Sequence, residues 1–112
     1  MARFEAKALD LNIEYKTLSG EEGELSPKIV VNTTKTIQII EQWRVMEKDE
    51  AEKKEGRMNP LEVTCIELEM IYPKPKKWWM DNFDLPTLGE IMTHVAETMG
   101  GIKKKEKSSK SS

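Results

Sequence analysis

The chain has 112 residues, of which 38% are hydrophobic and 34% charged, a composition that limits it to one domain with a modest core. Its 18 basic and 20 acidic side chains leave a net charge of −2; residues 103–112 hold five lysines against one glutamate (+4), so residues 1–102 carry −6. An acidic body is a poor nucleic-acid surface, and apolar runs of three residues at most exclude a membrane-spanning helix.

Residues 2–15 alternate between apolar and polar side chains, a period of two that predicts a strand. The phase slips at Ala8-Leu9, which indicates a bulge or a strand start there. Residues 19–23 include two glycines and predict a turn, so residues 25–31 are the expected partner strand. Pro27 confines that partner to a sheet edge or a bulge, because proline has no N–H for the ladder.

Thr33 and Thr34 are candidate N-caps for a helix. The apolar residues that follow have helical spacing: Ile39, Ile40, Trp43 and Met46. Residues 47–55 are charged helix formers without an apolar face, so we expect a solvated extension that frays towards Gly56.

Residues 60–72 contain two overlapping patterns. Asn59 and Pro60 predict a helix start, because proline is favoured at the first helical position. Helical spacing and strand alternation then coexist: Leu61, Cys65, Leu68 and Tyr72 fit a helix, and Ile66, Leu68, Met70 and Tyr72 fit a strand. Capping and length favour a helix, while periodicity leaves both structures open until two prolines end the element.

The last predicted helix has a complete apolar face, made by Leu88, Ile91, Met92, Val95, Ala96 and Met99. Asp84 or Thr87 can cap its start, with Glu90 completing a capping box, and Gly100-Gly101 predicts its end. We therefore expect an α+β fold, with an N-terminal β-hairpin or small antiparallel sheet followed by three to four helices. We expect residues 1–102 to form the single domain and the Lys/Ser-rich residues 103–112 to form a disordered basic tail.

Candidate catalytic groups are few. His94 is the one histidine and Cys65 the one cysteine, so an internal disulfide is excluded and a reducing cytoplasm is expected. Carboxylates beside His94 do not make a metal site, and a buried, inert thiol is the better interpretation of Cys65 among its apolar neighbours. We predict no catalytic residue, no metal and no cofactor.

Trp78, Trp79 and Phe83 concentrate three of the seven aromatic residues within six positions. Lysines precede them, which is compatible with a stacking platform for single-stranded nucleic acid. The preferred interpretation is core plus protein interface, because adjacent tryptophans cannot both point inward. The candidate interface residues, which could equally be core, are Trp78, Trp79, Phe83, Met92 and Met99.

The segment "KKWWMD" followed by "NFDLPTLGEIMTHVAETMGGIKKKEKS" resembles the C-terminal half of the tail assembly chaperones of long-tailed (siphovirus) bacteriophages of Gram-positive bacteria. The opening "ARFEAKALDLNIEYKTLSGEEGEL" is also similar to the start of those proteins. The resemblance spans most of the chain and concerns its layout rather than an invariant signature.

The resemblance implies a non-enzymatic protein that keeps the tape measure protein soluble in the host cytoplasm and is displaced as the tail tube protein polymerises. It implies absence from the mature virion and a longer form made by ribosomal frameshifting, for which the lysine codons at 103–105 are a candidate site. Seven methionines and apolar helix faces suit adaptable binding of amphipathic client helices. Self-association is left open, and neither nucleic acid nor membrane is expected as a partner.

Two other functions compete with this one. The first is a small phage structural or adaptor protein, a tail or head-completion module that binds another protein. The second is a nucleic-acid binder, which would show salt-sensitive binding to single strands. An enzyme is the least supported class.

Overall fold

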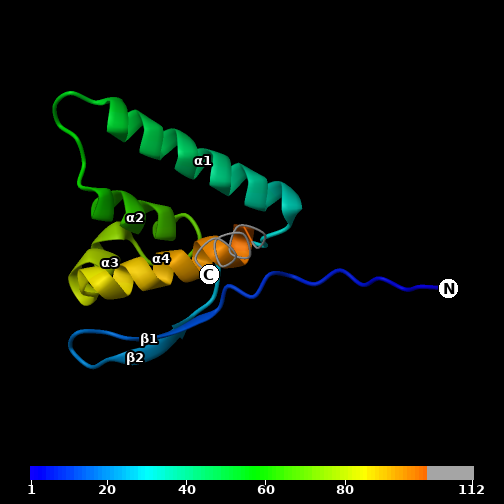
Figure 1. Ribbon diagram of the computed structural model, residues 1–112. Coiled ribbons are helices and arrows are strands. Elements are labelled where there is room, and N and C mark those ends of the chain that lie inside the picture. The colour runs from blue at the N-terminus through cyan, green and yellow to red at the C-terminus, as the bar shows by residue number, and fades with distance from the viewer. Residues whose placement is uncertain (101–112) are drawn as a thin grey trace, which may run out of the picture.

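The computed structural model describes residues 1–100 (Figure 1). A two-stranded antiparallel sheet is followed by four helices, which confirms the predicted α+β class. The elements are β1 (Ile13–Lys16), β2 (Glu22–Leu25), α1 (Thr33–Glu52), α2 (Pro60–Glu69), α3 (Lys76–Asn82) and α4 (Leu85–Gly100). The predicted basic tail at 103–112 lies outside the described residues.

The hairpin is shorter than its sequence pattern. β1 pairs with β2 from Ile13 opposite Leu25 to Lys16 opposite Glu22, and the connecting turn places Gly20 at φ +94°. Residues 2–12 form no strand although they alternate, because the four residues of β2 offer ladder partners only to β1. The expected partner strand also stops early, since Pro27 cannot donate and the N–H of Lys28 turns away to the carbonyl of Ile71 at 2.7 Å.

Helix α1 is capped one residue earlier than predicted. The side chain of Asn32 accepts a hydrogen bond from the N–H of Lys35 at 2.8 Å, so Thr33 and Thr34 are the first helical residues rather than caps. The predicted stripe is confirmed, because Ile39 and Trp43 are buried while Ile40 and Met46 pack against the core. The charged extension remains helical as far as Glu52.

The ambiguous segment at 60–72 is helical over Pro60–Glu69. The carboxamide oxygen of Asn59 accepts from the N–H of Leu61 at 2.8 Å, which confirms the predicted start. Packing explains the outcome: α2 lies against α3 and α4 as well as α1, so side chains are buried on several of its faces. This surrounding burial produces the overlapping apolar patterns.

Helix α4 begins at Leu85, where a carboxylate oxygen of Asp84 accepts from the N–H of Thr87 at 3.3 Å. Asp84 is therefore the cap, and Thr87 lies inside the first turn. Leu88, Val95 and Met99 of the predicted face are buried, whereas Ala96 is exposed.

Figure 1 shows α1 as the outermost layer, with α2 beneath it, then α3 and α4, and the hairpin on the opposite side. Among residues 1–100, no helix combines the length and apolar character needed to cross a membrane. The side chains buried most completely belong to Leu11, Cys65, Leu68, Ile71, Tyr72, Trp79 and Val95.

Candidate functional site

The two adjacent tryptophans of α3 occupy different environments. Trp79 is fully buried, and its indole N–H donates to the carbonyl of Lys74 at 3.2 Å. Trp78 is half-buried and meets the ring of Tyr15 edge-on, with 5.3 Å between centroids. Phe83 stacks on Trp79 at 5.8 Å and is also buried. The aromatic cluster therefore joins the hairpin to α3 and forms part of the core.

The five candidate interface residues divide between core and surface. Trp79, Phe83 and Met99 are buried and belong to the core. Trp78 and Met92 are half-buried and pack against the same core, and their remaining surface is accessible. Their contact with a partner stays a prediction.

The lysines beside the aromatic residues interact with other side chains of the protein. The ammonium of Lys74 lies 4.9 Å from the centre of the Trp78 ring, a cation–π contact. Lys76 pairs with Glu62 at 3.3 Å, and Lys77 pairs with Asp81 at 2.8 Å. A nucleobase stacking on Trp78 would have to compete with Lys74, and the nearby carboxylates offset the positive charge that phosphates need.

An apolar pocket of about 310 Å³ lies where the start of α2 meets α3 and α4. Three buried side chains, Cys65, Phe83 and Leu88, line it. Two large apolar side chains that also line it remain open to solvent, with Met80 43% and Leu85 58% exposed. The lining is completed by Asn59, Leu61 and Glu62.

This arrangement suits the capture of an apolar side chain from another protein. Burying one such side chain is worth about 1.5 to 3 kcal/mol, and exposed apolar surface beside a pocket is typical of interaction sites. The sequence pattern identified Phe83 but missed Met80 and Leu85. Leu85 lies one turn before Leu88, so extending the apolar face of the last helix backward by three residues would have found it.

The pocket is not arranged for nucleophilic catalysis. Burial raises the pKa of the Cys65 thiol, which disfavours the reactive thiolate. His94, the one candidate base for it, is exposed on α4 and does not line the pocket. Within residues 1–100, no three His, Cys, Asp or Glu side chains gather as a metal site.

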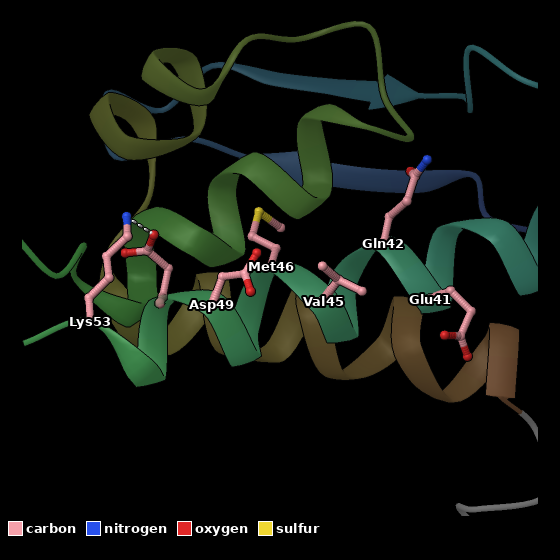
Figure 2. A pocket seen from close by; sticks show the side chains of 7 residues that line it. Glu41, Gln42, Val45, Met46, Asp49 and Lys53 are labelled. Carbon is pink, nitrogen blue, oxygen red and sulfur yellow. Dashed lines mark hydrogen bonds and ion pairs between the residues drawn. The ribbon is translucent and has the colours of Figure 1, made fainter.

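A second hollow, of about 530 Å³, runs along α1 (Figure 2). Val45 and Met46 supply its apolar surface, and Glu41, Asp49 and the ion pair between Lys53 and Glu50 surround them. All of its lining residues lie in α1 or immediately after it, so one helix forms the hollow without an opposing wall. The pocket between α2, α3 and α4 is therefore the better-formed candidate site.

Compared with protein families, with curated proteins and with solved structures, the chain matches none of them.

Proposed function

We propose that this chain is a non-enzymatic tail assembly chaperone of a long-tailed bacteriophage of Gram-positive bacteria, and that its client is the tape measure protein. The segment 76–108 and the opening residues 2–25 resemble such chaperones in layout. A client of long amphipathic helices presents apolar side chains at regular spacing, and a chaperone needs an apolar site to receive them.

The observation that carries the proposal is the pocket between α2, α3 and α4. Its buried floor and its two exposed side chains, Met80 and Leu85, offer an anchor for a leucine-sized or larger side chain. Methionine adapts to apolar surfaces of different shapes because it is unbranched and polarisable, which suits a client with many similar segments. The buried thiol of Cys65, and an exposed His94 that does not line the pocket, support binding rather than catalysis.

Co-expression tests the proposal. Helical fragments of the tape measure protein encoded by the same phage are expressed with the wild-type chain, with Leu85→Glu or with Leu18→Glu. Leu18 is 68% exposed in the hairpin turn, does not line the pocket, and serves as the matched control. We expect soluble fragment with the wild type and with Leu18→Glu, and a loss of at least about tenfold with Leu85→Glu, because a charge at the rim opposes apolar insertion.

Circular dichroism of the purified variants establishes that Leu85→Glu remains folded. A fragment that stays insoluble with the wild type would refute the chaperone function, and equal solubility with Leu85→Glu would refute the pocket as its site. The proposal includes action in the host cytoplasm and absence from the mature virion. The frameshifted longer form is tested by the gene, where lysine codons that interrupt a run of adenines at 103–105 would remove it.

A further inference from the structure

A carboxylic acid is enclosed between α1 and α2 without the partners that a charged group requires. Glu67, on α2, is 2% exposed, and its Oε2 atom has no hydrogen-bond partner among the described residues. The indole Nε1 of Trp43, on α1, is buried and likewise unpartnered within residues 1–100. Each unpartnered buried polar group costs about 1 to 3 kcal/mol, so both helices carry a penalty that undocking would relieve.

The group that faces Glu67 from α1 is another acid. Glu47 lies one helical turn after Trp43, and its carboxyl group acts on that of Glu67. Burial first, and then the facing carboxyl group of Glu47, raise the pKa of Glu67 to about 9. The proton on Glu67 is therefore what allows the two carboxyl groups to remain together.

The other helices that pack on α2 bring no compensating cation. Lys76 of α3 pairs with Glu62 instead, and α4 contributes buried apolar side chains such as Leu88 and Val95 to the core. No cation among the described residues forms an ion pair with Glu67. Glu67 thus faces the acid Glu47 of α1, and neither α3 nor α4 supplies a positive charge that would stabilise its ionised form.

Helix α1 is the element that can relieve this pairing by moving. It lies outside the other helices (Figure 1), and among the helices its main contacts are with α2. Its C-terminal loop belongs to the same body, because the guanidinium of Arg57 donates to the carbonyls of Ala51 and Lys53 and the N–H of Met58 donates to Glu50. Rotation about the residues next to Asn59 and about the exposed Val30 would carry α1 as a unit.

We propose that α1 is a hinged arm whose undocking from α2 lets Glu67 ionise, so that rising pH favours the open arm. When α1 is docked, Glu67 keeps its proton up to about pH 9, whereas the ordinary pKa of a glutamate side chain is 4.5. Between pH 4.5 and about pH 9, Glu67 is ionised in the undocked form and protonated in the docked form. The equilibrium constant for undocking therefore rises about tenfold per pH unit in that interval. This inference does not depend on the proposed chaperone function.

Amide hydrogen exchange of the full chain from pH 5.5 to 8.5, expressed as protection factors, tests the proposal. The variants are Glu67→Gln, which keeps the shape and a hydrogen-bond donor but cannot ionise, and Glu90→Gln, an exposed control on α4. We expect α1 protection in the wild type and in Glu90→Gln to fall by at least about tenfold per two pH units. In Glu67→Gln the α1 protection should stay constant.

Fluorine NMR of 5-fluorotryptophan protein gives a second readout. The Trp43 signal, assigned with Trp43→Phe, should move with pH in the wild type and remain fixed in Glu67→Gln, while the signal of the buried Trp79 stays unchanged. Constant α1 protection in the wild type, or the same pH dependence in Glu67→Gln, would overturn the proposal. Loss of α4 protection in step with α1 would also overturn it, because the whole domain would then be unfolding.

Discussion

The hydroxyl of Tyr72 donates a hydrogen bond to the backbone carbonyl of Leu11 over 2.6 Å, joining two fully buried residues that are 61 positions apart. Burial raises the pKa of Tyr72 to about 12, so the hydroxyl keeps its proton and remains a donor at any pH the protein would meet. This bond holds the segment before β1 against the residues that follow α2. Residues 1–10 are exposed, and Leu11 is the first buried residue of the chain.

Tyr72→Phe should lower the free energy of unfolding by about 1 to 3 kcal/mol, because the Leu11 carbonyl would be left buried and unpartnered. Urea denaturation followed by circular dichroism measures the change. Tyr15→Phe is the matched control, since Tyr15 is half-buried and its hydroxyl forms no hydrogen bond with residues 1–100. A Tyr72→Phe protein as stable as the wild type would show that the bond contributes nothing to folding.

Two glycines should respond to alanine in opposite ways. A Cβ atom at Gly23 would come within 2.5 Å of the Tyr15 hydroxyl, whereas a Cβ at Gly89, inside α4, would meet nothing within 4 Å. Gly23→Ala should therefore displace Tyr15 and destabilise the domain by about 1 to 3 kcal/mol. Gly89→Ala should stabilise it by about 0.5 to 1 kcal/mol, because alanine is the better helix former.

Thermal unfolding of both glycine variants beside the wild type measures these changes. The Tyr15 ring contacts Trp78 at 5.3 Å, so Gly23→Ala should also alter tryptophan fluorescence. Destabilisation by both alanines would contradict the open surroundings of Gly89.

Trp79→Ala and Trp78→Ala should differ in cost. Trp79 is fully buried, and its removal leaves a large cavity worth about 3 to 5 kcal/mol, enough to unfold a marginally stable domain. Trp78 is half-buried, so its loss should cost roughly half as much or less. Chemical denaturation of the two variants measures the difference, and equal costs would contradict their different burial.

Glu67→Gln should change stability in a pH-dependent way. The folded-state pKa of Glu67 is raised from 4.5 to about 9, so the unfolded chain loses this proton before the folded chain does. The free energy of unfolding therefore falls as the pH rises from 4.5 to about 9, by as much as about 1.4 kcal/mol per pH unit. Glu67→Gln does not show this decrease, because glutamine does not ionise. The gain should be about 1 to 3 kcal/mol at pH 7 and close to zero at pH 4.

Denaturation curves of the wild type, Glu67→Gln and the exposed control Glu90→Gln at pH 4, 5.5, 7 and 8.5 measure this dependence. Wild-type and Glu67→Gln stabilities that stay parallel across the series would contradict it. Glu47→Gln should have an intermediate effect, because burial, the larger cause of the raised pKa, remains when the facing charge is removed.

Local patterns predicted the helices well. The stripe from Ile39 to Met46 and the Asn59-Pro60 start are confirmed, because spacing and capping act within a few residues and need no distant partner. The strand pattern of residues 2–12 did not form a strand, since a strand requires a neighbour and the chain places only four residues of β2 beside it.

The candidate site was less accessible to sequence reasoning. Phe83 was predicted, but the pocket also needs Met80 and Leu85, which face it only because α3 and α4 meet at the start of α2. Glu67 gave no signal at all, since a glutamate in a charge-rich chain is expected at the surface.

The sequence by itself determined the order of the elements, the helix start at Asn59-Pro60 and the apolar faces of α1 and α4, because these depend on local sterics and periodicity. The tertiary structure alone decided which of two adjacent tryptophans is enclosed, where an apolar pocket remains open, and that Glu67 lies against Glu47. Those outcomes depend on how helices far apart in the chain pack together, and no spacing within one segment encodes them.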